Sequence, residues 1–190
     1  METINLGKTY KKEIQPKLSE KLGGLNIYET PRLTKIVLNI GVGKMMATHK
    51  LQSSTKKTDE EAIKDVIEAL SLIGGQRPHT IRARRSIAGF KLREGMLIGV
   101  STTLRGQRMY DFLGRLVHIG LPRTRDFRGI PLDSVDRSGN LTIGIRDATI
   151  FPEMLQVNFT LRFEATLVIS TKNRDEGIIL LKELGIPFAN

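Results

Sequence analysis

The sequence predicts one α+β domain over residues 1–190, in which a mostly antiparallel sheet packs one face on helices and leaves its other face open and polar. Segments with apolar residues at every second position predict half-buried strands, and segments with helical spacing predict amphipathic helices. The strands follow one another without strict βαβ alternation, which favours antiparallel pairing. A chain of 190 residues with 39% hydrophobic residues can bury a core of its own.

The N-terminal third predicts two helices around one strand. A helix over 10–22 would be kinked or shortened by Pro16 and would end at two glycines. A strand over 33–40 alternates apolar and polar residues and stops at a Gly-Val-Gly sequence. The next helix starts at a capping box formed by Thr58 and Glu61 and ends at a second pair of glycines.

Residues 76–104 are typical of two strands joined by a long arm at about 81–95 that is rich in arginine. In the second of these strands, apolar residues again alternate with small or polar ones. The segment 44–57, which follows the first predicted strand, is expected to be a loose loop, and no function is assigned to it.

A second core helix is predicted over 109–117, where apolar residues fall three and four positions apart. Gly120 and Pro122 should end it, because neither residue continues a helix readily. Arg108 and Arg115 are expected on its outward face.

The C-terminal third predicts two further strands and a helix. A short strand covers 141–145, and a longer one with clean alternation covers 159–169. Asn173 and Glu176 form a cap for the final helix, which ends at Gly185.

The net charge of +10 lies almost entirely in one segment. Residues 77–128 contain 12 Lys and Arg residues against three acids, a net charge of +9, and eleven of these cations are arginine. Arginine pairs with phosphate oxygens through a planar fork and stacks on bases, so the segment indicates a nucleic-acid partner. The alternative is a set of solvated or internally paired arginines, for which the segment offers only three acids.

The strand phases place five polar residues on the open face of the sheet. These residues are Lys35, Asn39, Ser101, Thr103 and Arg105. Amides, hydroxyls and arginine with few stacking aromatics suit a folded RNA, recognised through its backbone, 2′-hydroxyls and accessible base edges.

No catalytic residue, metal site or cofactor is expected. The chain has no cysteine, and its three histidines do not fall at metal-ligand spacing. The Gly-Val-Gly at 41–43 lacks the remaining glycine of a dinucleotide fingerprint. A membrane partner is not expected either, because the cations lie in a glycine-interrupted arm and no apolar run is long enough to span a bilayer. A cytoplasmic location fits these features.

Five blocks of sequence together resemble one known family. They are Ile-Val-Leu-Asn-Ile-Gly-Val-Gly (36–43), Gly-Gly-Gln-Arg-Pro (74–78), Ala-Arg-Arg-Ser-Ile-Ala-Gly-Phe-Lys-Leu-Arg-Glu-Gly (83–95), Thr-Leu-Arg-Gly-Gln-Arg-Met-Tyr-Asp-Phe (103–112) and Pro-Arg-Thr-Arg-Asp-Phe-Arg-Gly (122–129). In this order, and from about Tyr10 to Phe188, the chain closely resembles the 5S-RNA-binding ribosomal protein five family of the bacterial large subunit. The segment 44–57 looks longer than its counterpart in that family.

The resemblance implies a structural protein of the large ribosomal subunit that holds 5S rRNA in the central protuberance, against the large-subunit rRNA and neighbouring proteins. It implies 5S rRNA contacts from Asn39, Gln76 and Thr103, to which we add Arg105 on the same predicted face. It also implies that the arm reaches transfer RNA in the peptidyl site, and that the chain joins an intersubunit bridge with a protein of the small-subunit head.

The basic residues divide into two predicted groups. The phosphate-binding candidates of the arm are Arg82, Arg84, Arg85, Lys91 and Arg93. The candidates for additional RNA contacts are Arg77, Arg108, Arg123, Arg125 and Arg128. Two other classes remain open at this point: a free-standing RNA chaperone, and an RNA-processing or nucleotide-dependent enzyme that uses the same basic surface.

Overall fold

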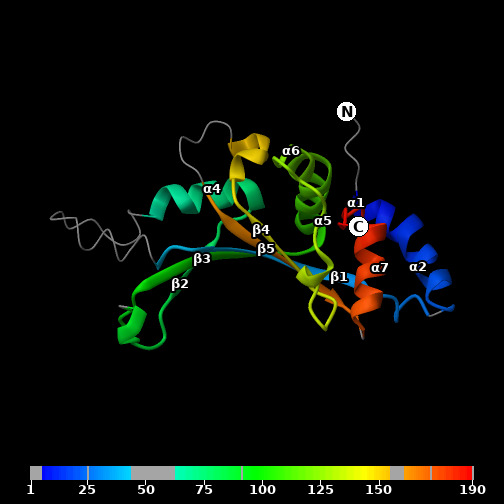
Figure 1. The fold of residues 1–190 in the computed structure, drawn as a ribbon, viewed down its shortest axis with the longest axis horizontal. Coiled ribbons are helices and arrows are strands. Elements are labelled where there is room, and N and C mark those ends of the chain that lie inside the picture. Colours follow the sequence, from blue (N-terminus) through cyan, green and yellow to red (C-terminus); the bar gives the residue numbers. More distant parts are fainter. Residues whose placement is uncertain are drawn as a thin grey trace.

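A five-stranded antiparallel sheet runs along the molecule (Figure 1). This computed structural model describes residues 6–24, 26–43, 63–90, 92–154, 161–171 and 173–189. The strands are β1 (Arg32–Gly41), β2 (His79–Arg82), β3 (Leu97–Leu104), β4 (Leu141–Ile145) and β5 (Phe163–Ser170). Their spatial order is β2-β3-β1-β5-β4, and every neighbouring pair is antiparallel, which confirms the predicted fold class.

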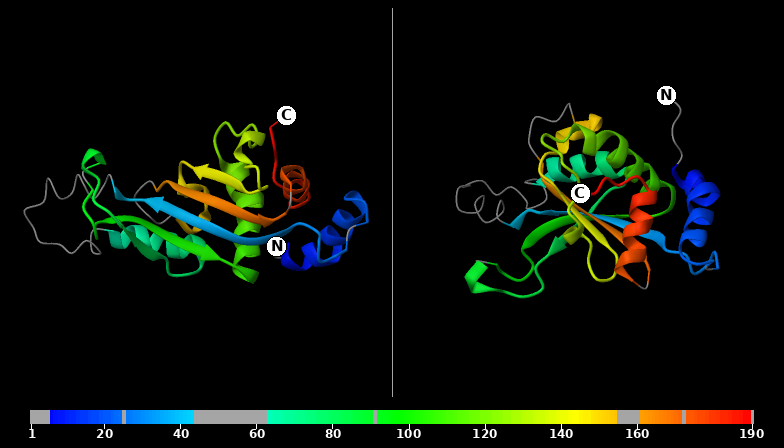
Figure 2. Two further views of the ribbon diagram at one scale, coloured as in Figure 1. Left: turned by 90° about the horizontal axis from the view of Figure 1, so that it is seen from below. Right: turned by 45° about the vertical axis from the view of Figure 1, so that its right-hand side comes forward.

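Helices cover one face of the sheet and one of its ends (Figures 1 and 2). The α- and π-helical segments are α1 (Leu6–Thr9), a π-helical turn (Tyr10–Ile14), α2 (Gln15–Lys21), α4 (Lys64–Gly74), α5 (Gly106–Arg115), a second π-helical turn (Leu116–Gly120), α6 (Leu121–Arg123) and α7 (Arg174–Glu183). In Figure 1, α4 and α5 lie on one side of the sheet, whereas α2 and α7 lie at the end away from the arm. None of the helices in the described part of the chain is long and apolar enough to cross a membrane.

Two helix boundaries differ from the prediction, and both differences involve proline. The first helix begins at Leu6 and runs past Pro16 to Lys21, and the helix of residues 106–123 continues past Pro122. Each proline stands in the first turn of the segment that follows a π-helical turn. The π-helical turn just before each proline changes the hydrogen-bond spacing of the helix there, so the helix continues although proline donates no backbone hydrogen bond.

The core lies between the helix-covered face of the sheet and the helices. β1 contributes Ile36, Leu38 and Ile40, the residues whose alternation predicted the strand, and all three are buried. Phe112 of α5 stacks on Phe151 with 5.9 Å between ring centroids. Burial of each such side chain stabilises the fold by about 1.5–3 kcal/mol, so the apolar face of the sheet is what holds the helices in place.

The predicted arm is a hairpin that extends β2 and β3 beyond the end of the sheet (Figure 1). The Ala83 N–H donates to the Met96 carbonyl at 2.8 Å, and the Gly95 N–H donates to the Ala83 carbonyl at 2.9 Å. Farther out, Ile87 and Leu92 form an isolated bridge. The arm is therefore held by backbone pairing across its base.

Four sequence predictions concern residues outside the described part of the chain. They are the loop at 44–57, the capping box at Thr58 and Glu61, the start of the last strand at Phe159, and Lys91 of the arm.

Candidate nucleic-acid interface

A row of mostly polar residues crosses all five strands on the open face of the sheet. Asn39 of β1 lies opposite Ser101 of β3 on one side and opposite Glu164 of β5 on the other. β2 adds His79 beside Ser101, and β4 adds Gly144 beside Glu164. In an antiparallel pair, directly opposed side chains are about 4.5–5.5 Å apart at their Cβ atoms, so neighbours in this row can bind one ligand group together.

A second row runs parallel to the first, two residues along each strand. Thr103 of β3 lies opposite Val37, which in turn lies opposite Thr166. The hydroxyls of Thr166 and Thr142 are 3.2 Å apart. The predicted placement of Asn39 and Thr103 on one face is therefore confirmed, and Lys35 lies on the same face of β1.

The register confirms the predicted placement of Ser101 on this face, opposite Asn39, but its hydroxyl is not available to a ligand. Ser101 is only 5% exposed, and its Oγ donates to the Leu38 carbonyl at 3.0 Å. β3 lies between two other strands, so a side chain as short as serine satisfies its hydroxyl inside the sheet.

Gln76 lies at the point where α4, β3 and α5 come together. Its Nε2 donates to the Thr103 carbonyl at 3.5 Å, and its Oε1 accepts from Nη1 of Arg108 at 3.3 Å. Gly75 precedes it in the left-handed conformation, with φ +62°, and turns the chain out of α4. Arg105 is exposed next to Thr103, as the residue before α5. Three of the residues predicted to contact 5S rRNA are thereby brought to one end of the sheet.

The arm presents arginines and an aromatic ring to solvent. Arg84, Arg85 and Arg93 are exposed, whereas Nη1 of Arg82 donates to the Gly95 carbonyl at 3.2 Å and ties the two sides of the arm together. Phe90 is 75% exposed. No pattern in the sequence distinguishes Phe90 from a core residue, although an exposed aromatic beside arginines is a typical stacking platform for unpaired bases.

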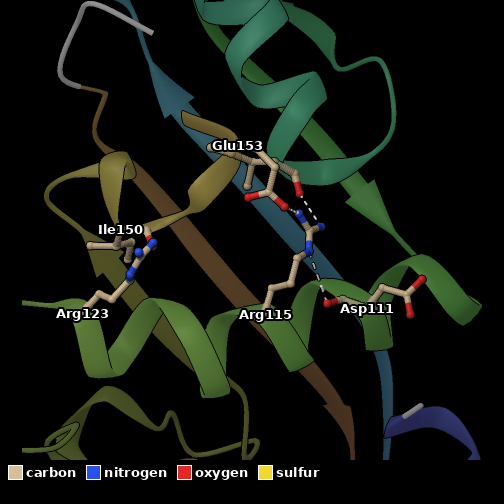
Figure 3. Close-up of polar contacts among 6 residues, drawn as sticks. Asp111, Arg115, Arg123, Ile150 and Glu153 are labelled. Atoms are coloured by element: carbon tan, nitrogen blue, oxygen red, sulfur yellow. Dashed lines mark hydrogen bonds and ion pairs between the residues drawn. The ribbon is translucent and has the colours of Figure 1, made fainter. Parts of the chain in front are cut away.

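A cleft of about 930 Å³ lies between the loop after α6 and β4. Arg123 at the end of α6 and Arg125 and Arg128 of the loop, three of the predicted additional contacts, line one side of the cleft, and Arg146, which follows the edge strand, lines the opposite side. Arg123 also lies 3.5 Å from the Ile150 carbonyl (Figure 3). Arg77, the remaining predicted contact, is exposed between α4 and β2.

The loop that follows α6, residues 124–129, is called the arginine loop. Residues near the C-terminus hold the end of this loop in place. The Ile130 N–H donates to the Pro187 carbonyl, and the Ala189 N–H donates to the Ile130 carbonyl, both at 2.9 Å. Gly129 has φ +103°, and a Cβ at this position would lie 2.5 Å from the Ala189 nitrogen. The glycine that ends the Pro-Arg-Thr-Arg-Asp-Phe-Arg-Gly block is thus required by the close approach of a second backbone.

Arg115 points inward, and the prediction that it faces outward was wrong. Its Nη1 pairs with Oε1 of Glu153 at 2.5 Å, and its Nη2 donates to the Ile73 carbonyl at 2.7 Å (Figure 3). Its Nε also lies 3.5 Å from the Asp111 carbonyl. The apolar spacing of α5 identified its core face, but it could not show that α4 and the turn Pro152–Met154 cover a second side of the helix.

The structure adds two charged residues to the predicted interface, Glu164 and Arg146. The alternation of the last strand does place Glu164 at a polar position, but only the pairing with β1 shows that it stands beside Asn39. Among the residues that the structure describes, no group of three His, Asp or Glu side chains could hold a metal ion.

Sequence comparisons identify the family. The family model for ribosomal protein L5 matches residues 26–93, and a second model, for the C-terminus of the same ribosomal family, matches residues 97–188. The large ribosomal subunit protein uL5 of Syntrophomonas wolfei is 45% identical over 185 residues, which cover 96% of this chain and 98% of that protein. The uL5 proteins of Leuconostoc mesenteroides and of Synechococcus sp. are 45% and 40% identical, and each alignment covers at least 97% of both chains.

These relatives are ribosomal proteins and not enzymes, and they align with the chain over nearly its whole length. The open polar face and the exposed arginines agree with the RNA binding that the family implies. The chain therefore belongs to the ribosomal protein L5 family, and it is a structural, RNA-binding protein of the large subunit of the cytoplasmic ribosome.

Proposed function

We propose that this protein binds 5S rRNA through the open face of its sheet and anchors it in the central protuberance, against the large-subunit rRNA and neighbouring proteins. The observation that carries the proposal is the strand register. It brings Asn39 and Thr103 to one face, and Gln76 packs against the Thr103 carbonyl at its end. These side chains are uncharged, so they can distinguish the groups of a folded RNA, whereas arginines bind phosphate without regard to sequence.

The arm and the arginine loop are proposed to bind RNA other than 5S rRNA. Arg84, Arg85 and Arg93 project from the arm, beyond the end of the sheet, and are proposed to bind phosphates of peptidyl-site transfer RNA. Phe90, at 75% exposure, adds a surface on which a base can stack. The arginine loop and the cleft beside β4 are proposed to bind further RNA. A contact with a protein of the small-subunit head completes the proposed set of partners.

The proposal is tested by measuring the affinity of the purified protein for 5S rRNA. Replacement of Asn39 or Thr103 by alanine is expected to weaken binding by about 1–3 kcal/mol, because a buried hydrogen-bonding group of the RNA loses its partner. The logarithm of the affinity should fall linearly with the logarithm of salt concentration, with a slope of about −0.7 to −0.9 for each phosphate neutralised. Absence of 5S binding, or binding that does not depend on salt, would refute the proposal.

The free-standing RNA chaperone that the sequence left open is not favoured, because the full-length relatives are named as proteins of the large ribosomal subunit. The two functions differ in where the protein resides. A ribosomal anchor should sediment with large subunits after a salt wash at moderate ionic strength, whereas a chaperone should be released. Recovery of the protein only in the unbound fraction would favour the chaperone.

A further inference from the structure

Glu164 places a carboxylate beside the central strand, on the face that we propose binds RNA. It lies on β5, directly opposite Asn39 of β1 and directly opposite Gly144 of β4. The side chain is exposed, and it forms no ion pair or hydrogen bond with the residues that the structure describes. Among the described strand residues on this face, Glu164 is the one acid.

A carboxylate in this position repels phosphate. In a protein of net charge +10, an unpaired acid in the middle of an RNA-binding face would weaken binding unless the RNA offers it hydrogen-bond donors. The sugar-phosphate backbone has only the 2′-hydroxyl as a donor, whereas base edges have N–H groups. The position of Glu164 therefore favours a base, and not a phosphate, at this point of the interface.

The two neighbours of Glu164 define which base edge fits. An ionised carboxylate only accepts hydrogen bonds, through two oxygens, whereas the Asn39 amide can donate. Guanine is the base whose Watson–Crick edge places two adjacent donors, N1–H and the N2 amino group, beside an acceptor, O6. On the other side of Glu164, Gly144 has no side chain, and a Cβ added there would meet nothing within 4 Å, so β4 does not cover the carboxylate on this side.

We propose that Glu164 and Asn39 together recognise an unpaired guanine of 5S rRNA. Glu164 accepts from N1–H and from the N2 amino group, and the Asn39 amide donates to O6. Glu164 is then a determinant of specificity, since it binds the correct base and repels misplaced phosphate. This inference rests on the proposed 5S rRNA binding, and it identifies a guanine base as the group that binds at Glu164 and Asn39.

The test compares three variants for their affinity to 5S rRNA and to a transfer RNA of similar charge density. Glu164→Ala and Glu164→Gln remove the carboxylate from the face, and Glu20→Gln is the matched control, because Glu20 is an exposed acid on α2, outside the sheet. We expect Glu164→Ala to lower the affinity for 5S rRNA about ten- to a hundredfold, as loss of a bidentate base contact does, and to leave transfer RNA binding unchanged or tighter.

Inosine interference identifies the base. In 5S transcripts that carry inosine, which lacks the N2 amino group, at scattered guanine positions, substitution at one unpaired guanine should reduce binding to the wild-type protein. The same substitution should have no effect on binding to the Glu164→Ala variant.

Three outcomes are distinguishable. The control Glu20→Gln is expected to bind 5S rRNA as tightly as wild type. If Glu164→Ala also binds as tightly as wild type, or more tightly, the carboxylate does not contact a base and the inference is overturned. A second outcome is that Glu164→Ala lowers the affinity, but inosine substitution has no effect on binding to the wild-type protein, whereas a 2′-deoxy substitution weakens binding to the wild-type protein and not to the variant. Glu164 then binds a ribose hydroxyl, and the guanine assignment is wrong. If the wild-type protein does not bind 5S rRNA, the proposed function itself fails, whatever Glu164 does.

Discussion

Arg108 and Arg115 lie on the same helix, α5, and do different work. Arg108 is exposed, and its Nη1 donates to Oε1 of Gln76 at the edge of the proposed interface. Arg115 connects α5 with two other segments, since it pairs with the Glu153 carboxylate and donates to the Ile73 carbonyl near the end of α4. A basic residue in an arginine-rich segment can therefore be part of the fold and not of the binding surface, and only its partners show which.

Replacement of Arg115 by alanine should destabilise the protein and leave RNA contacts intact. The Ile73 carbonyl and the Glu153 carboxylate lose their donor, at a cost of about 1–3 kcal/mol for a partly buried site. The measurement is the urea midpoint of unfolding, with 5S rRNA affinity measured under conditions where the variant is folded. Arg108→Ala is the matched control, and it should show the reverse pattern. Equal midpoints for the two variants would contradict the internal role of Arg115.

Tyr10 should make stability depend on alkaline pH. Burial, with a smaller contribution from nearby Tyr110, raises the pKa of Tyr10 to about 12, and its hydroxyl donates to the Pro31 carbonyl at 3.0 Å. Because the folded protein favours the protonated phenol, this stabilisation is complete below the ordinary pKa of 10.0 and is lost as the pH rises toward 12.

The check is urea unfolding of wild type and of Tyr10→Phe at pH 7 and pH 11. At pH 7 the variant should be less stable by about 1–3 kcal/mol, because the Pro31 carbonyl loses its donor. At pH 11 the difference between the two proteins should shrink. Tyr28→Phe is the control, since Tyr28 is 88% exposed, and it should follow wild type at both values. A gap that stays constant with pH would show that ionisation of Tyr10 is not involved.

Among the elements, the arm is predicted to bind an RNA other than the one that the open face of the sheet binds. Its backbone pairing begins at β2 and β3 and continues to the bridge between Ile87 and Leu92, so it is an extension of the sheet rather than a loop. Its exposed arginines nevertheless lie beyond the end of the sheet, away from the polar rows that cross it (Figure 2). The two surfaces can therefore be changed one at a time.

Replacement of both Arg84 and Arg85 by alanine should spare binding to isolated 5S rRNA and weaken contacts that exist only in the assembled ribosome. Loss of two phosphate contacts should reduce the slope of log affinity against log salt concentration by about 1.4–1.8. The measurements are 5S rRNA affinity in solution and occupancy of peptidyl-site transfer RNA on subunits that carry the variant. Equal losses in both measurements would contradict this separation of roles.

Local sequence signals predicted most elements because each strand and helix carries its own pattern. Ile36, Leu38 and Ile40 identify both β1 and its buried face without knowledge of any partner. The signals failed where a non-local contact decides the outcome. Pro16 and Pro122 were expected to disturb or end helices, but tertiary packing and π-helical turns carry the helices past both residues.

The interface could be predicted only in part for the same reason. Strand phase alone placed Asn39 and Thr103 on one face, and the pairing of β1 with β3 confirms it. The availability of the Ser101 hydroxyl depends on a hydrogen bond to the neighbouring strand, and the position of Glu164 beside Asn39 depends on a partner 125 residues away in the sequence. Neither the bond nor the partner is encoded in a local pattern.

At the scale of the whole molecule, the net charge of +9 in residues 77–128 divides among separate surfaces. The arm, the start of α5 and the loop after α6 each carry a share, and Arg115 uses its charge inside the fold. The row through Asn39 and Glu164, by contrast, has no arginine or lysine, and its one formal charge is the Glu164 carboxylate. The molecule therefore combines several surfaces that attract RNA with one that can select it.

We also infer that the chain folds as one unit, although the two family models meet within the arm, between residues 93 and 97. β1 and β2 come before the arm and β3, β4 and β5 come after it, yet β3 lies between β1 and β2 in the sheet. β1 and β2 pair only with strands that come after the arm, and among those later strands only β4 and β5 pair with each other, so the full sheet forms only when both halves are together. Cleavage of the exposed arm by a protease should therefore leave two fragments that stay bound to each other. For the same reason, the arm is a suitable site for the new termini of a circularly permuted chain.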